Sequence, residues 1–566
     1  MEFSKLNGYD VKDKKAIRFY DNISSMKSDN TLKEGMYVKT KGYYSALDGG
    51  HGEYIIVDDN TLIEDDSLIH ALSNGLFAKL IIENFINIKQ FGIKSDGETD
   101  DTTAIQYALD YIDSIGGGTL YIPAGTYIIG ETIKVPSNTI VKGSGKATIL
   151  KASNDYDNNN SSATYKSMII LKTNTMATST GEHDINFIDF TIDNNNQTYA
   201  GRNGIFHIRG LKNSYFKNLN INVSGDNVWG MQIYSANKYM TLDTISINNS
   251  STDNSLGGCL WVRTGMAVYT NDDFKSYGIN ITNCNFESTA KDELVCIADG
   301  LANGWTEVNM SNCTIKGQAT TTYASAGLII NAVGDDTSIV KANISNVSIL
   351  GKYNIAGIIA GSSGRNENCT QITLSNINID LEACDFGIRG YYKVFVTESY
   401  IKVPTGKKGV YNTNISNSKL IGYAEASIVN NCDITGNANY GCTNCPVVMN
   451  SKVRGNAYAI QTFGHFQARF TNNELIAPTY GIFGNINNSQ GLYNSIITDN
   501  YIYRPEASSN TGTSGIYITY SDYCVIKNNR VLYTNGTTGN STGFLYDVTT
   551  TNGTHVTKED NSVIVS

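Results

Sequence analysis

Four carboxylates near the middle of the chain have the side-chain type and spacing for acid–base chemistry. They are Asp226, Asp253, Asp292 and Glu293. Glycosidic-bond hydrolysis needs two carboxyl groups flanking the bond, about 5 Å apart for retention and about 6.5–9.5 Å apart for inversion. Adjacent carboxylates raise the pKa of one partner, which can then serve as an acid. We therefore expect Asp292 or Glu293 to be the general acid and Asp253 or Asp226 the base.

Residues suited to binding a sugar lie in the same segment. The three tryptophans of the 566-residue chain, Trp229, Trp261 and Trp305, all fall there. An indole can stack on the C–H face of a sugar ring. Arg263, beside Trp261, could clamp an acidic sugar or a phosphate of the polymer. This clustering predicts a glycan-binding groove. The alternative is that the tryptophans fill wide coils and the acids solvate turns.

A different reaction, β-elimination, would use other residues. A lyase needs a base such as histidine or arginine near the C5 proton of a uronate. His207 and Arg209, in the stretch IFHIRG, are candidates, although a histidine in such a strand is more often a hydrogen-bonded core residue. No cofactor is expected, but a lyase could collect Ca²⁺ from scattered acids.

A recurring motif indicates the elements that must position these side chains. From about residue 151 onward, an asparagine repeatedly precedes alternating β-branched or aromatic residues, as in NCNFES, NCTIKG, NVSILG and NINIDL. The interval is about 20–35 residues, which is typical of a solenoid. The units hold short strands and no helical pattern. The alternatives are a β-propeller, whose blades are usually longer, at about 40–50 residues, and a series of β-sandwiches.

A parallel β-helix explains why asparagine precedes the strands. Coils stacked at about 4.8 Å satisfy one another's backbone groups and bury alternate apolar side chains. Asparagine tolerates left-handed turn geometry at the corner of a coil. Asparagines at the same corner of successive coils can also join their amides in a hydrogen-bonded ladder.

The stretch GIKSDGETDDTTAIQYALDYIDSIGGGTLYIPAGTYII, residues 92–129, changes from a helical to a strand pattern. Asp100 or Asp101 can cap the helix, and Gly116 to Gly118 can end it. Its apolar face comprises Ala104, Ile105, Ala108, Leu109, Ile112 and Ile115. Because the first coil of a solenoid has an open interior and open strand edges, we expect this helix to cover them.

The same residues closely resemble the N-terminal motif of the pectate lyase-like β-helix superfamily. The preceding LKEGMYVKTKGYYSALDGGHGEYIIVDD resembles the segment before such domains in bacteriophage tailspikes and appendage proteins. The resemblance implies an all-β fold, a right-handed parallel β-helix with an N-terminal capping α-helix and a small leader domain. The expected organisation is a virion-attachment-like leader over residues 1–85, the capping helix and first coils over 86–150, and the β-helix over 151–566.

The resemblance also implies a function. It suggests a phage tailspike-type virion protein, usually a homotrimer, that binds and depolymerises a bacterial surface polysaccharide or teichoic acid. The stretch KDELVCIADG resembles acidic segments that carry active-site aspartates in β-helix glycosidases, with Glu293 in place of the second aspartate. Two alternatives stay open: a polysaccharide lyase, and a non-enzymatic adhesin whose Tyr- and Asn-rich C-terminal third presents stacked aromatics. That surface could equally be the trimer interface.

Composition restricts the partners. The net charge is −10 and the sequence has no basic runs, which argues against nucleic-acid binding. No apolar run reaches the roughly 18 residues of a membrane span. The first residues lack the apolar region of a signal peptide, so we expect synthesis in the host cytoplasm. Most of the ten cysteines lie in strand-like runs, and we expect them to be reduced core residues.

Overall fold

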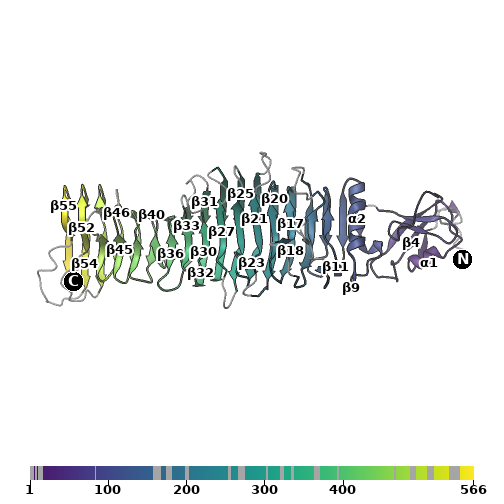
Figure 1. The fold of residues 1–566 in the computed structure, drawn as a ribbon, viewed down its shortest axis with the longest axis horizontal. Coiled ribbons are helices and arrows are strands. Elements are labelled where there is room, and N and C mark those ends of the chain that lie inside the picture. The colour runs from purple at the N-terminus through teal and green to yellow at the C-terminus, as the bar shows by residue number, and fades with distance from the viewer. Residues whose placement is uncertain are drawn as a thin grey trace. The chain divides into compact units, whose positions relative to one another are not determined.

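The computed structural model describes eighteen segments of the chain (Figure 1). These are residues 5–6, 9–10, 17–82, 84–156, 167–173, 181–197, 203–252, 256–264, 275–300, 304–318, 324–332, 337–361, 370–391, 394–464, 467–484, 492–505, 515–534 and 548–565. They form two compact units, residues 1–248 and 249–566. No helix within these segments has both the length and the apolar character needed to cross a membrane.

The first unit begins with a small mixed sheet, here called the leader. After β1 (Lys5–Leu6) and β2 (Tyr9–Asp10), its strand order is β3 (Arg18–Tyr20), β4 (Tyr37–Thr40), β5 (Gly52–Val57), β7 (Phe77–Leu80) and β6 (Ile69–Ala71). Only the β3–β4 pair in this sheet is parallel. Helix α1 (Ile23–Lys27) begins with a capping box at Asn22. Val38, Tyr54 and Ile56 are fully buried between these elements.

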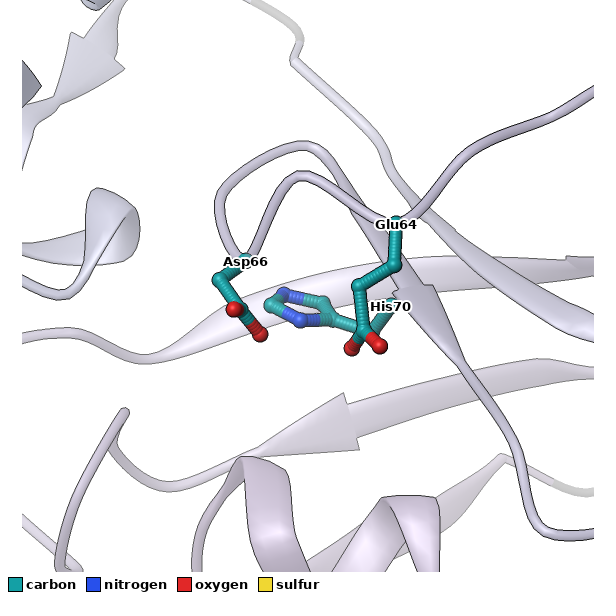
Figure 2. A group of neighbouring side chains, drawn as sticks. All are labelled: Glu64, Asp66 and His70. Atoms are coloured by element: carbon teal, nitrogen blue, oxygen red, sulfur yellow. The ribbon is translucent and has the colours of Figure 1, made fainter.

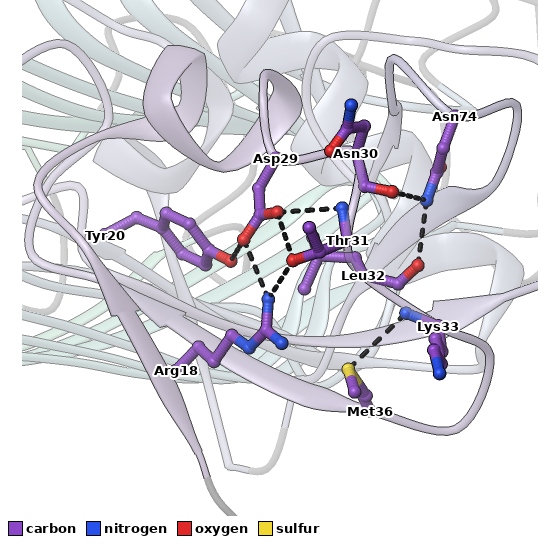
Figure 3. Close-up of polar contacts among 9 residues, drawn as sticks. All are labelled: Arg18, Tyr20, Asp29, Asn30, Thr31, Leu32, Lys33, Met36 and Asn74. Carbon is purple, nitrogen blue, oxygen red and sulfur yellow. Dashed lines mark hydrogen bonds and ion pairs between the residues drawn. The ribbon is translucent and has the colours of Figure 1, made fainter.

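A polar network holds the loop after α1 in place (Figure 3). The Asp29 carboxylate accepts hydrogen bonds from Arg18 Nη1 at 2.9 Å, Tyr20 Oη at 2.6 Å and the Thr31 backbone N–H at 2.9 Å. Hydrogen bonds from Thr31, followed by that from Tyr20, hold the pKa of Asp29 well below its ordinary value. Asn74 Nδ2 donates to the carbonyl of Leu32 at 2.8 Å and so ties the β6–β7 turn to the same loop.

The capping helix α2 (Thr102–Ser114) forms as the sequence predicts. Ile105, Ala108, Leu109 and Ile112 are buried, whereas Ile115 is not on the buried face. Ile115 is instead the C-cap residue and is 54% exposed, because Gly117 N–H already bonds to the Ile112 carbonyl and turns the chain away. That expectation for Ile115 is therefore wrong.

The acids before α2 act in turns and caps. Asp100 Oδ1 accepts the Thr102 N–H at 2.9 Å, and Asp96 Oδ1 accepts the N–H groups of Glu98 and Thr99 at 2.9 and 2.8 Å. Asp101 is the N-cap residue, but its side chain makes no cap bond and is 3% exposed. Burial raises the pKa of Asp101 from 3.8 to about 6.

Helix α2 lies beside the edge strand β12 (Ile133–Val135), and one of its side chains forms hydrogen bonds with the backbone of that strand. Gln106 Oε1 accepts the Lys134 N–H at 2.9 Å, and Gln106 Nε2 donates to the Lys134 carbonyl at 3.1 Å. The amide of one glutamine thus replaces the peptide group that a further strand would supply. Open strand edges recruit other chains, so this contact protects the beginning of the solenoid.

The rest of the first unit consists of parallel coils. One sheet contains β8 (Ile86–Asn87), β9 (Asp96–Asp100), β10 (Gly118–Ile122), β11 (Gly125–Ile129), β13 (Thr139–Gly143), β14 (Thr148–Ala152), β16 (Asn186–Asp193), β18 (Lys212–Val223) and β20 (Lys238–Asn249). The facing sheet contains β12, β15 (Ile169–Leu171), β17 (Asn203–Arg209) and β19 (Val228–Tyr234). The short helix η1 (Ile88–Phe91) follows β8 and ends at Gly92 with φ +74°.

The second unit is also a parallel β-helix, with two consecutive strands of each coil in a first sheet and one in a second sheet. The first sheet comprises β22 (Ser276–Thr282), β23 (Asn285–Ser288), β25 (Trp305–Ser311), β26 (Thr314–Gly317), β28 (Ile339–Ser345), β29 (Ser348–Lys352), β31 (Thr370–Ser375), β32 (Asn378–Ala383), β34 (Val394–Thr397), β35 (Tyr400–Lys402), β37 (Asn414–Ser416), β38 (Lys419–Ile421), β40 (Ile428–Asn430), β41 (Asp433–Thr435), β43 (Val447–Met449), β44 (Lys452–Arg454), β46 (Arg469–Thr471), β47 (Glu474–Ile476), β50 (Ile496–Thr498), β51 (Tyr501–Pro505), β53 (Val525–Lys527), β54 (Arg530–Thr534), β56 (Thr557–Glu559) and β57 (Ser562–Val565).

The second sheet of this unit supplies the surface on which the candidate site lies. It comprises β21 (Leu260–Thr264), β24 (Val295–Asp299), β27 (Ala326–Ala332), β30 (Ala356–Ala360), β33 (Phe386–Gly390), β36 (Lys408–Tyr411), β39 (Tyr423–Glu425), β42 (Tyr440–Thr443), β45 (Tyr458–Thr462), β48 (Tyr480–Gly484), β49 (Leu492–Tyr493), β52 (Ile516–Asp522) and β55 (Val548–Thr554). Figure 1 shows these strands as successive parallel arrows.

An asparagine corner joins the two first-sheet strands of most coils in the second unit, as predicted. Asn312, Asn346 and Asn376 have φ of +55°, +53° and +51°. The amide of Asn346 donates to Asn312 Oδ1 at 3.2 Å, and that of Asn376 donates to Asn346 Oδ1 at 2.6 Å. The corner stays fixed while coil length varies, since bonded corner residues are 34 positions apart at Asn346 but 14 apart at Asn431.

The coil interior is apolar and contains most of the described cysteines. Stacked positions such as Met310, Ile344 and Leu374 pair in register on successive coils and are buried. The nine described cysteines form no disulfide, and all except Cys296 are buried. This agrees with their predicted role as small core residues; Cys369 lies outside the described residues.

The corner geometry predicts a specific stability pattern. Asn431 (φ +53°) and Asn343 are both exposed, and each donates one amide hydrogen bond to the previous coil. Asn343→Ala should cost about 0.5 kcal/mol for its hydrogen bond. Asn431→Ala should cost about 1–2 kcal/mol, because alanine also resists positive φ. Asn431→Gly should recover most of that difference, as measured by urea unfolding. Equal losses in all three variants would contradict this account.

The buried Asp101 predicts a pH dependence. Since its pKa is about 6 in the folded protein and 3.8 ordinarily, the folded state holds a proton that the unfolded state releases between these values. Stability from this group is therefore present at about pH 4 and declines as the pH rises to about 6, by roughly 2–3 kcal/mol. Asp101→Asn should flatten the dependence of melting temperature on pH over that interval. An unchanged slope would contradict the burial effect.

Candidate functional site

The predicted acid pair Asp292 and Glu293 lies at the corner that leads into β24, and the corners of neighbouring coils stack on it. Asp292 Oδ2 accepts the Gly257 N–H of the preceding coil at 2.9 Å. Glu293 Oε1 accepts a hydrogen bond from Ser325 Oγ of the following coil at 2.9 Å. The two side chains therefore bond to opposite neighbours, and both stay partly exposed.

The two predicted bases, Asp253 and Asp226, belong to different units of the chain. Asp253 lies outside the described residues, but Asn249 and Gly257 on either side of it are placed. The Asn249 carbonyl accepts the Thr289 N–H at 3.0 Å, and Gly257 bonds to Asp292. Asn249 and Gly257, which flank Asp253 in the sequence, therefore both contact the coil that carries Asp292. Asp226 belongs to the first unit, in the turn before β19, where its carboxylate accepts the Asn227 N–H at 2.9 Å.

Trp261 and Arg263 project from β21, which pairs with β24. Trp261 is opposite Cys296 and Arg263 is opposite Ala298. Both side chains are partly exposed, and the Arg263 guanidinium carbon lies 5.5 Å from the centre of the Trp261 ring. Within the described segments Arg263 forms no ion pair and its Nε has no hydrogen-bond partner. The Arg263 guanidinium is thus available to bind an anionic group.

The other two tryptophans differ in exposure. Trp305, the first residue of β25, is partly exposed and has the ammonium of Lys341 4.3 Å from its ring centre. Trp229 in β19 is only 1% exposed and is among the largest fully buried side chains. A ring in that position packs the interior and offers no face to a sugar.

The sequence reasoning did not select Asp299, at the end of β24. Its side chain is 0% exposed and accepts a hydrogen bond from Thr264 Oγ1. Thr264 Oγ1 is also 3.1 Å from Thr306 Oγ1. A fully buried carboxylate bonded to a threonine of the neighbouring coil is an unusual core feature. The one sequence signal for Asp299 is its place at the end of a strand of apolar residues, in the stretch CIADG.

The candidate lyase residues lie in β17 of the first unit. His207 is 1% exposed, has Nδ1 3.2 Å from Gln232 Oε1, and stacks on Tyr234 at 5.1 Å. Burial lowers the pKa of His207 to about 4, so its imidazole is neutral and enclosed near pH 7. Arg209, two residues further on, is opposite Tyr234 in the strand register.

A strip of aromatic rings covers later strands of the second sheet. Its members, here called the aromatic strip, are Tyr423, Tyr440, Tyr458, Tyr480, Phe483 and Tyr517. Tyr440, Tyr458 and Tyr480 share one register position on successive coils, with ring centres 5.7 Å apart at each step. All six side chains are partly exposed.

Comparison with known sequences agrees with this coil architecture. The family described as "Rhamnogalacturonase A/epimerase, pectate lyase-like" matches residues 85–321. Residues 85–321 of the chain are therefore similar to the pectate lyase-like family. The match begins one residue before β8 and includes α2, Asp292, Glu293 and all three tryptophans.

Proteins with similar sequences include phage and bacterial proteins. The pre-neck appendage protein of Bacillus phage phi29 is 26% identical over 349 residues, which are 57% of this chain and 38% of that protein. The chain thus spans well under half of that relative's length. Alginate lyase 7 of Azotobacter vinelandii is 34% identical over 125 residues, which are 20% of this chain and 13% of the lyase.

Solved structures similar to this chain include a phage tailspike. It is the tailspike protein of Acinetobacter baumannii bacteriophage Fri1, a capsular polysaccharide depolymerase. That structure is 13% identical, with a TM-score of 0.36 over 95% of this chain and 75% of the tailspike chain.

Proposed function

We propose that this protein is a phage tailspike- or appendage-type component that binds a bacterial surface polysaccharide and hydrolyses it. The observation that supports this best is the corner at β24, where Asp292 and Glu293 lie in the coil next to Trp261 and Arg263. Asp292 precedes Cys296, the partner of Trp261, by four residues. This corresponds to at most about 13 Å along a strand, a distance that a short oligosaccharide segment can bridge.

The proposed hydrolysis uses the stacking of coils. One carboxyl of the Asp292–Glu293 pair donates a proton to the leaving oxygen. A carboxylate on the neighbouring coil would lie about 4.8 Å from it in the stacking direction, and Asp253 is the residue proposed for this role. That spacing suits a nucleophile and a retaining reaction, whereas a base two coils away would suit inversion. The partly exposed Trp261 would stack on the sugar beside the cleaved bond.

Arg263 indicates which glycans would fit. Its guanidinium lies over the Trp261 ring and has no carboxylate partner within the described residues. A planar guanidinium binds carboxylates and phosphates through paired hydrogen bonds. Uronate-containing capsules and teichoic acids both carry such groups. We therefore propose an acidic surface polymer as the substrate. We also propose that the protein assembles as a homotrimer on the virion.

The hydrolase proposal predicts the effect of conservative substitutions. Asp292→Asn and Glu293→Gln keep the acceptor oxygens that bond to Gly257 and Ser325 but cannot transfer the proton. The variant that removes the general acid should lower kcat by about 10²–10⁴-fold, and Asp253→Asn should act similarly. Release of reducing ends from capsule or wall teichoic acid measures this loss.

The control substitution is Asp433→Asn, on an exposed first-sheet strand of the same unit. It should leave the rate unchanged, and circular dichroism should show every variant folded. Full depolymerisation by all three site variants would overturn the proposal. A product with the ultraviolet absorbance of an unsaturated uronate would replace hydrolysis with elimination.

A second candidate is adhesion without cleavage, and the aromatic strip favours it. Aromatic side chains supply large, rigid contact areas. The rings that stack at one register position form a continuous surface along several coils. An extended polymer could bind to this surface.

The adhesion candidate has its own test. Replacing Tyr458 and Tyr480 by Ala should weaken polysaccharide binding at least about tenfold, because each ring contributes about 1 kcal/mol of contact. The molecular mass in light scattering should stay the same. Asn343→Ala, on the other sheet, is the control. A loss of mass with unchanged binding would show that the strip is a subunit interface instead.

A further inference from the structure

The loop between β5 and β6 brings two acids beside a buried histidine in the leader. Asp65 Oδ1 accepts the backbone N–H groups of Ser67, Leu68 and Ile69 at 2.9, 2.8 and 2.8 Å. This folds the loop tightly against the start of β6. The carboxylates on either side of Asp65, those of Glu64 and Asp66, then face His70 in the middle of β6 (Figure 2).

His70 has the character of a ligand that lacks its partner. Its side chain is 0% exposed, and neither ring nitrogen has a hydrogen-bond partner in the described part of the chain. The edges of Tyr43 and Tyr54 confine the ring, with centres 6.0 and 5.5 Å away. Buried polar groups normally form hydrogen bonds. Two unsatisfied nitrogens beside a pair of carboxylates therefore point to a cation.

We propose that Glu64, Asp66 and His70 bind a divalent transition-metal ion such as Zn²⁺. One ligand atom from each side chain lies within 4.8 Å of the others. Metal–ligand bonds of about 2.0–2.2 Å put ligand atoms about 3.5 Å apart, so small side-chain rotations complete the geometry. One imidazole and two carboxylates form a mixed nitrogen–oxygen set, which favours Zn²⁺ or Co²⁺ over the all-oxygen preference of Ca²⁺ and Mg²⁺.

The site is open to solvent on the Asp66 side. The Asp66 side chain is 74% exposed and that of Glu64 is 31% exposed. An ion can therefore enter from solvent and keep water in its remaining coordination positions.

Lys27 competes with the metal. Its ammonium forms an ion pair with Glu64 and lies 3.7 Å from Asp66. In the metal-free protein this charge balances the two acids. Metal binding must displace the ammonium, so Lys27 lowers the affinity. If Glu64 and Asp66 only formed ion pairs, they would need Lys27. A metal site formed by the same acids would instead bind its ion more tightly when Lys27 is absent.

The test uses the full-length protein with Co²⁺ and Zn²⁺ as probes. Co²⁺ should produce visible d–d absorption bands, and calorimetry with Zn²⁺ should show one site per chain. Glu64→Gln, Asp66→Asn and His70→Gln should each weaken binding by at least about tenfold. Lys27→Met should strengthen it by a similar factor. Zn²⁺ should also raise the melting temperature of the wild-type protein but not of His70→Gln.

The controls separate this site from adventitious binding. His51 is an exposed histidine of the same unit, and His51→Ala should bind Zn²⁺ as the wild type does. Ca²⁺ and Mg²⁺ should produce no saturable heat. Unchanged affinity in Glu64→Gln and Asp66→Asn, or weaker binding in Lys27→Met, would overturn the proposal. These variants do not involve the coil residues, so depolymerisation and metal binding are tested separately.

Discussion

Backbone hydrogen bonding between consecutive coils is the constraint on which the whole structure depends. A coil has no partner for its N–H and C=O groups except the coils before and after it. Their registers must therefore agree, and the corner between the two first-sheet strands fixes the register. Asn312, Asn346 and Asn376 hold that corner at positive φ and bond to one another. The apolar interior then follows, because alternate residues on correctly registered strands face inward.

Local signals allowed the architecture to be predicted. The asparagine that recurs before the second first-sheet strand of most coils indicates the corner, and the pattern from Asp101 to Gly118 indicates the capping helix. Both depend on residues close together in the sequence. Ile115 was assigned incorrectly because helical periodicity continues past the residue at which the backbone actually turns. The exposed end of a helix is decided by the C-cap, which a three-to-four residue spacing does not reveal.

The candidate site could be predicted only in part. Asp292 and Glu293 were recognisable as adjacent acids before an apolar strand, but their opposite hydrogen-bond partners depend on the stacking of three coils. Exposure was harder to infer: nearly every residue of β19 is buried, so alternation could not separate Trp229 from Trp261. The aromatic strip was anticipated only as a Tyr-rich region, because its members are unevenly spaced. In the leader, His70 is brought to Glu64 by a loop that has no sequence signature.

The variable length of the coils has a consequence for how such a protein can diversify. The hydrogen-bonded corner residues Asn312 and Asn346 are 34 positions apart, whereas Asn417 and Asn431 are only 14 apart, yet both pairs keep the corner and its hydrogen bond. Insertions and deletions are therefore tolerated on the far side of each coil without rewinding its neighbours. Lengthening one coil at a time would change the outer surface and leave the corners in place. Chimaeras joined at equivalent corners should keep a continuous core and exchange only the outer surface.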